Sequence, residues 1–187
     1  MSSKDSIVDQ VHDKGLDMRT RTIFLQGDVD EVTYEQFSRN MHLLEKGTGE
    51  ITIKMCSGGG HVSYGWGIYD LIKQSKHFIR IIVEAKCESM STVILQAADE
   101  RVTHKNARMM LHYGTEEYPE DHSENIKRWQ KWGEKDEAKT QEIYLEKIRE
   151  KKPRFTKKKL QDLLTFDTIL GPKEAIELGL LDKEFGE

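Results

Sequence analysis

Three polar residues, Ser89, His112 and Asp167, have the side-chain types of a nucleophilic site. A serine hydroxyl attacks a carbonyl group when a histidine removes its proton and a carboxylate holds that histidine in the required tautomer. Each residue also has an ordinary structural interpretation: a serine that caps a helix, a histidine buried beside a strand, and an aspartate that caps a helix. The spacing alone does not establish that the three side chains meet.

A glycine-rich turn at residues 57–60, Ser-Gly-Gly-Gly, is a second feature that could serve chemistry. Glycines let backbone N–H groups approach a ligand closely, and such a turn before a helix suits a phosphate or an oxyanion. The sequence lacks the Gly-Lys-Ser/Thr of a Walker loop. A tight turn without a ligand is the alternative.

Strands and helices are expected to alternate around these residues, which predicts an α/β fold with largely parallel strands. Asp30 is the expected N-cap of the first helix, and Gly179 is the expected C-terminal stop of the last. Residues 87–89 are predicted to form a turn. The predicted strands are 22–25, 51–55, 79–83, 101–103 and 108–111, and the predicted helices are 30–45 (with Val32, Phe37, Met41 and Leu44 buried), 62–74, 90–98, 125–149, 157–165 and 172–178.

The composition of the 187-residue chain fits one domain, with 36% hydrophobic and 33% charged residues and a net charge of -4. No run reaches the roughly 18 apolar residues of a membrane-spanning helix, and the first twenty residues show no secretory signal. The acidic balance argues against a nucleic-acid partner, despite a basic run between residues 147 and 159. Cys56 and Cys87 are expected to be reduced thiols in a cytosol.

Four motifs, in the same order, resemble those of the Clp proteolytic subunit family. The first is the glycine turn with the helix after it, and the others surround the serine, the histidine and the aspartate. The resemblance extends over roughly residues 20–185. The motifs read Ser57-Gly58-Gly59-Gly60-His61-Val62 with Gly67-Ile68-Tyr69-Asp70, Ser89-Met90, Arg108-Met109-Met110-Leu111-His112, and Asp167-Thr168-Ile169-Leu170 with Glu174-Ala175 and Gly179-Leu180-Leu181-Asp182.

The resemblance implies a serine endopeptidase that cleaves peptides and unfolded proteins in the cytoplasm, without a metal or cofactor. Ser89 would be the nucleophile, His112 the base and Asp167 the residue that orients it. The N–H groups of Gly60 and Met90 would form the oxyanion hole. Nucleic acid and membrane are not expected as partners.

The resemblance also implies a fold: a ClpP/crotonase-like spiral of strand-strand-helix units with a protruding helical handle. Residues 1–20 would be a polar arm and residues 21–187 one peptidase domain, with the handle at about 113–155. Such chains form homo-oligomers, so a heptamer, or a tetradecamer of two stacked rings, is expected, with an AAA+ unfoldase as a partner left open.

Several residues depart from the family pattern. Gly58 replaces a proline, Glu88 replaces an alanine, and Ser91 and Thr92 replace a Gly-Ala pair. Residues 113–119 lack the glycine-rich strand that docks peptides in the family. Two alternatives therefore stay open: a crotonase-like acyl-CoA enzyme, and a non-catalytic or specialised subunit, for example one for virus maturation.

Overall fold

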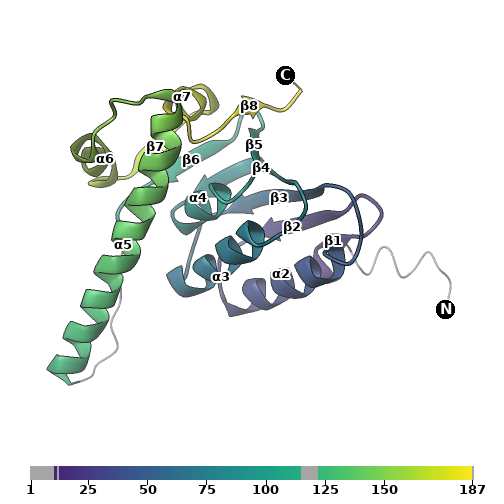
Figure 1. Ribbon diagram of the computed structural model, residues 1–187, viewed down its shortest axis with the longest axis horizontal. Coiled ribbons are helices and arrows are strands. Elements are labelled where there is room, and N and C mark those ends of the chain that lie inside the picture. The colour runs from purple at the N-terminus through teal and green to yellow at the C-terminus, as the bar shows by residue number, and fades with distance from the viewer. Residues whose placement is uncertain (1–10, 12, 115–121, 187) are drawn as a thin grey trace.

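The body of the protein is a mixed β-sheet with helices packed on it, seen in a computed structural model that describes residue 11, residues 13–114 and residues 122–186 (Figure 1). The eight strands of the described residues are β1 Leu16–Asp17, β2 Thr22–Gln26, β3 Ile51–Ser57, β4 Ile79–Glu88, β5 Glu100–Thr103, β6 Arg108–Leu111, β7 Thr168–Leu170 and β8 Lys183–Glu184. The helices are α2 Glu31–Leu44, α3 Val62–Lys73, α4 Met90–Leu95, α5 Ser123–Lys151, α6 Lys157–Leu164 and α7 Pro172–Leu178.

The sheet has the order β1-β2-β3-β4-β5-β8, and its central strands β2 to β5 run parallel. Strand β4 changes partner along its length: residues 80–83 pair with β5, and residues 86–88 pair with β6. A register shift against β3 lies between these two parts. Strand β7 then pairs with the other edge of β6 in the antiparallel sense. The predicted α/β fold with largely parallel strands is confirmed.

The core follows from the hydrophobic pattern of the central strands. Alternate residues of β3 are buried, as a strand with one face on the core requires. Helices α2 and α3 lie side by side against the sheet (Figure 1). Asp30 is the N-cap of α2, where its carboxylate accepts a hydrogen bond of 2.8 Å from the Thr33 N–H. Gly179 ends α7 in the left-handed conformation, as predicted.

Helix α2 differs from the prediction at one position of its buried face. Val32 lies in the first turn and is 71% exposed, so its predicted burial is wrong. Asn40 is buried instead, beside Phe37, Met41 and Leu44. Its side-chain amide donates a 2.7 Å hydrogen bond to the Lys14 carbonyl. A polar residue can occupy the core face here because this bond satisfies its amide.

The strands are more extensive than predicted. Strand β4 continues to Glu88, so residues 87 and 88 are strand and not turn, since they pair with β6. Strand β1 lies within the segment predicted to be an arm, where Leu16 is 2% exposed and pairs with Ile23. Strands β7 and β8 were not predicted. Helix α4 ends at Leu95, before the predicted residue 98.

Helix α5 is the predicted handle, and it projects from the sheet as a long rod (Figure 1). Its second half is anchored, because Tyr144, Leu145 and Ile148 are buried. Its first half carries Trp129 and Trp132, which are 57% and 58% exposed. Most of the segment 113–119, which departs from the family pattern, lies outside the described residues, since these leave out residues 115–121.

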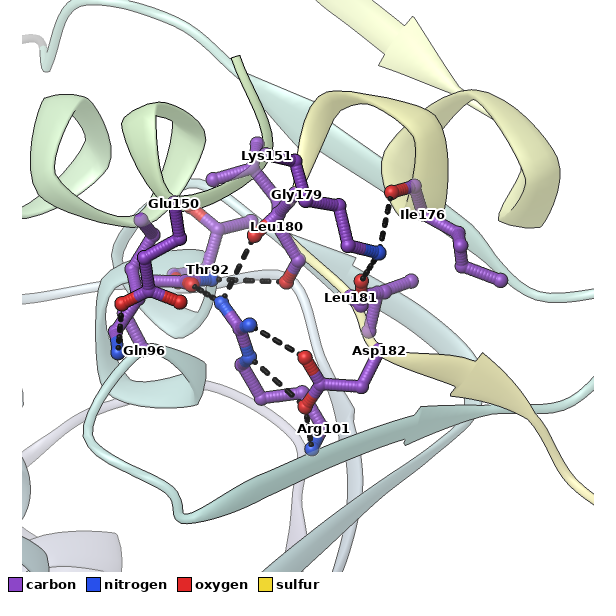
Figure 2. A network of polar contacts seen from close by, with 11 residues as sticks. Thr92, Gln96, Arg101, Glu150, Lys151, Ile176, Gly179, Leu180, Leu181 and Asp182 are labelled. Carbon is purple, nitrogen blue, oxygen red and sulfur yellow. Dashed lines mark hydrogen bonds and ion pairs between the residues drawn. The ribbon is translucent and has the colours of Figure 1, made fainter. Parts of the chain in front are cut away.

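A buried network of polar contacts fixes the far end of α4 (Figure 2). The Arg101 side chain is 5% exposed and forms an ion pair of 2.5 Å with Asp182 near the C-terminus. Its guanidinium also donates to the Gln96 side chain at 2.6 Å and to the Gly179 carbonyl at 3.0 Å. Gln96 in turn donates to the Thr92 carbonyl at 3.1 Å. The C-terminal segment is thereby tied to the short helix that follows Ser89.

Candidate active site

Ser89 lies between the end of β4 and the start of α4 in an unusual backbone conformation. Its φ is 52° and its ψ is -129°, a region that residues other than glycine rarely adopt. The Ser89 side chain makes no capping hydrogen bond to α4. The helix-cap interpretation is therefore wrong, because the hydroxyl points elsewhere. This geometry is that of a strained turn which presents a side chain at a strand end.

The Ser89 hydroxyl contacts the imidazole of His112. Strand β6 runs beside the last residues of β4, and the Ser89 N–H donates a 2.9 Å hydrogen bond to the Met110 carbonyl. His112 follows β6 directly, and its Nε2 lies 2.9 Å from Ser89 Oγ. This distance suits a hydrogen bond through which a proton can pass from serine to imidazole.

Asp167 lies on the other side of the imidazole ring. It directly precedes β7, whose pairing with β6 places Thr168 opposite Leu111. Asp167 Oδ1 is 3.4 Å from His112 Nδ1, and the Asp167 side chain is 67% exposed. The structure thus brings together the three residues predicted from the sequence. Neighbouring strands β4, β6 and β7 position one residue each.

The glycine turn packs directly against Ser89. Gly59 has a φ of 87°, and a β-carbon at this position would lie 2.8 Å from the Met90 nitrogen. Gly60 has a φ of 146° and forms a parallel bridge with Val29. Neither the Gly60 N–H nor the Met90 N–H donates a hydrogen bond to any residue that the structure describes. The turn therefore has the backbone conformation and the close approach that only glycine permits.

Two residues directly before Ser89, the thiol Cys87 and the carboxylate Glu88, have their own surroundings. The Glu88 carboxylate lies 2.7 Å from Arg108 Nε and 3.8 Å from Lys86 Nζ. Burial raises the pKa of the Cys87 thiol to about 12. Cys56 is half-buried, and both cysteines are free, as predicted. Cys87 is thus a protonated packing residue at neutral pH.

Sequence reasoning missed three polar groups that support the site. Ser91 and Thr92 are fully buried, although the sequence suggested only that these two residues depart from the family pattern. Ser91 Oγ accepts from the Glu88 N–H at 2.8 Å and lies 3.1 Å from the Ser57 carbonyl. Thr92 Oγ1 lies 2.5 Å from the hydroxyl oxygen of Tyr144 on α5. The replacement of a small pair by two hydroxyls was the available signal, but only folding shows their partners.

The residues that the structure describes offer neither a cluster of metal ligands nor a membrane-spanning helix. In those residues, no group of three or more His, Cys, Asp or Glu side chains could hold a metal ion. Among the helices of the same residues, none is long and apolar enough to cross a membrane.

A serine, a histidine and an aspartate at these distances form the arrangement that serine hydrolases use. Comparison with known proteins defines the family: residues 6–185 match the Clp protease family model, and the chain belongs to that family. The ATP-dependent Clp protease proteolytic subunit of Mesostigma viride is 29% identical over 174 residues, which are 88% of this chain and 71% of that protein.

Two further likenesses agree with this assignment. The chloroplastic ATP-dependent Clp protease proteolytic subunit 3 of Arabidopsis thaliana is 30% identical over 99 residues, or 51% of this chain. The aligned part spans only 32% of that relative's length. A mutant ClpP1 from Listeria monocytogenes has a TM-score of 0.80 over 97% of each chain, at 23% identity. The predicted divergent Clp membership and fold are confirmed, and the structural likeness concerns the fold alone.

Proposed function

We propose that the protein is a serine endopeptidase whose catalytic residues are Ser89, His112 and Asp167. The observation that carries the proposal is the 2.9 Å contact between Ser89 Oγ and His112 Nε2. His112 takes the serine proton as the hydroxyl attacks a peptide carbonyl, and returns it to the leaving amine. Asp167 holds the ring so that Nε2 is the acceptor. Membership of the Clp protease family supports this chemistry.

The oxyanion of the tetrahedral intermediate is bound by the N–H groups of Gly60 and Met90. Met90 opens α4, so its N–H lies at the positive end of a helix beside Ser89. The close packing of Gly59 on the Met90 nitrogen holds the glycine turn against the nucleophile. Donors fixed in this way stabilise the developing negative charge without reorganisation.

Peptides and unfolded proteins are the proposed substrates, because the curated relatives are named as proteolytic subunits. A homo-oligomeric ring is the proposed form. The exposed half of α5 carries Trp129 and Trp132, two large aromatic side chains that a single chain leaves in water. We propose seven subunits in the ring and a second stacked ring, as the resemblance to the Clp proteolytic subunit family implies. An AAA+ unfoldase partner is proposed because the relatives are named ATP-dependent. The cytoplasm is the proposed location, although one relative is named as chloroplastic.

Labelling with a fluorophosphonate tests the proposal. Wild-type protein should react at Ser89, identified by peptide mass mapping, and should cleave unfolded casein. Ser89→Ala should lose both properties. Ser63→Ala, at an exposed serine on α3, is the matched control and should keep both. Equal casein cleavage by wild type and Ser89→Ala would refute the assignment.

A further inference from the structure

The peptide group between Ser89 and Met90 joins the proposed nucleophile to a proposed oxyanion donor. Its N–H belongs to Met90, and its carbonyl belongs to Ser89. Because a trans peptide is planar, the N–H and the carbonyl point in opposite directions. Whatever holds the Ser89 carbonyl therefore also fixes the direction of the Met90 N–H.

Thr92 holds this carbonyl with two hydrogen bonds. Its backbone N–H donates to the Ser89 carbonyl oxygen at 2.9 Å, and its hydroxyl donates to the same oxygen at 2.6 Å. The backbone bond is the ordinary hydrogen bond of a helical turn. The second exists only because residue 92 carries a hydroxyl, where the family pattern has alanine. Thr92 is fully buried, so water does not compete for this bond.

Tyr144 completes the arrangement from the long helix α5. Its hydroxyl lies 2.5 Å from Thr92 Oγ1, and the residue is 3% exposed. The Thr92 hydroxyl has one proton and donates it to the Ser89 carbonyl oxygen, so the Tyr144 hydroxyl must be the donor in its bond with Thr92 Oγ1. Burial raises the pKa of Tyr144, which keeps its hydroxyl protonated as a donor. Two consecutive hydrogen bonds thus run from α5 to the peptide that follows the nucleophile.

We propose that Thr92 and Tyr144 are positioning residues, which aim the Met90 N–H at the oxyanion and retain the strained Ser89 backbone. The inference rests on the proposed function, since an oxyanion must form there. It also assigns a role to α5 beyond a surface for assembly: the buried half of the helix fixes the donor geometry of the active site. Removal of either the Thr92 or the Tyr144 hydroxyl should weaken binding of the transition state more than binding of the substrate.

Isosteric variants test the pair. Thr92→Val should lower kcat about tenfold, less than the roughly hundredfold or greater loss that follows removal of an oxyanion donor. Its KM for a fluorogenic short peptide should stay within about twofold, because ground-state binding is untouched. A peptide boronic acid, whose adduct is tetrahedral, should bind more weakly in proportion to the fall in kcat/KM. Thr92→Ser restores the hydroxyl and should restore kcat.

Tyr144→Phe provides the second variant and keeps the packing of the ring. It should lower kcat about threefold, as the loss of one neutral hydrogen bond does. The double variant should be no slower than Thr92→Val alone, because both act through one contact. Thr103→Val is the matched control: it removes another buried threonine hydroxyl, which bonds to the His104 carbonyl at 3.2 Å, and kcat should not change.

Three outcomes decide the inference. The inference is supported if wild type turns over peptide and the variants show the losses of kcat given above. Full activity in a folded Thr92→Val variant overturns it. If wild type neither hydrolyses peptides nor reacts at Ser89 with a fluorophosphonate, the proposed function fails. The crystal structure of Thr92→Val then decides the positioning separately. A rotated peptide between Ser89 and Met90 supports it, and an unchanged peptide overturns it.

Discussion

Gly59 and Ser89 are in such close contact that a β-carbon on Gly59 would lie 2.8 Å from the β-carbon of Ser89. The same added atom would lie 2.7 Å from the Glu88 carbonyl oxygen. The glycine turn and the proposed nucleophile therefore form one packed unit, although they lie on different strand ends. Their separation leaves no room for a side chain on the turn.

Gly59→Ala should sharply reduce peptide cleavage while leaving the fold largely intact. Alanine at a φ of 87° costs about 1–2 kcal/mol, and relief of the contact must move Ser89 or the turn. Peptidase assays and thermal unfolding measure the two effects. Gly58→Ala is the control, because its β-carbon would meet chiefly the flexible end of Lys86, at 3.2 Å. Equal activity in both variants would contradict the packing argument.

His112→Ala and Asp167→Asn should each lower kcat by about 10⁴-fold, as in other catalytic triads. Neither substitution opens a core cavity, because Asp167 is exposed and His112 is only partly buried. Circular dichroism should therefore show an unchanged fold. Steady-state cleavage of a fluorogenic peptide provides the test, and near-normal turnover in His112→Ala would exclude the triad.

The cysteines should prove dispensable for cleavage. With its pKa raised to about 12 by burial, the Cys87 thiol forms almost no thiolate at neutral pH. Iodoacetamide at pH 8 should therefore modify Cys56 well before Cys87, as mass spectrometry can establish. The Cys56→Ser/Cys87→Ala double variant should keep most of its activity. A folded double variant without activity would indicate a thiol mechanism instead.

The Arg101–Asp182 ion pair should make stability depend on pH in the acid range. Burial alone would raise the pKa of Asp182, but the hydrogen bonds from Arg101 outweigh it and hold the pKa below its ordinary value of 3.8. This stabilisation is present above pH 4 and is lost as pH falls through the folded-state pKa. Asp182→Asn should cost about 3 kcal/mol at pH 7, because it leaves Arg101 buried without its charged partner.

Urea unfolding at several pH values measures this difference. The gap in unfolding free energy between wild type and Asp182→Asn should narrow as pH falls below about 4, where the wild-type carboxylate also becomes neutral. Asp30→Asn gives a comparison at a half-buried helix cap. A gap that stays constant from pH 7 to pH 3 would show that the ion pair contributes no pH-dependent stability.

Light scattering after size exclusion tests the ring. The expected mass is seven times the 21.7 kDa of one chain, or fourteen times for two stacked rings. Replacing the exposed Trp129 and Trp132 by serine should shift the protein towards smaller species, since it removes apolar surface from the proposed contact. Wild-type protein that stays at 21.7 kDa at all concentrations would exclude the ring.

The sequence predicts most of the elements because their signals are local. Asp30 caps its helix through a residue three positions away, and Gly179 ends its helix by its own backbone conformation. Strand β7 has no such signal: it has three residues and no buried position, and it forms by pairing with β6. The extension of β4 was missed for a similar reason, because the polar residues Glu84 and Lys86 interrupt its apolar run.

The candidate site likewise has features that the sequence predicts and features that only the folded chain shows. Ser89, His112 and Asp167 were identified by recognising motifs, and the family match supports that recognition. Their meeting depends on the pairing of β4 with β6 and of β6 with β7, which no local pattern encodes. The Thr92–Tyr144 contact joins residues that are 52 positions apart, so only the folded chain shows it.

The change of partner along β4 divides the strand into two parts that differ in how they should tolerate substitution. The half of β4 at residues 79–83 packs in the hydrophobic core and tolerates little change in volume. The half at residues 86–88 pairs with β6 and alternates a buried cysteine with charged side chains. A charged residue can therefore stand beside the nucleophile without loosening the core. The charged Glu88 next to Ser89, where the family pattern has alanine, is a substitution of this kind.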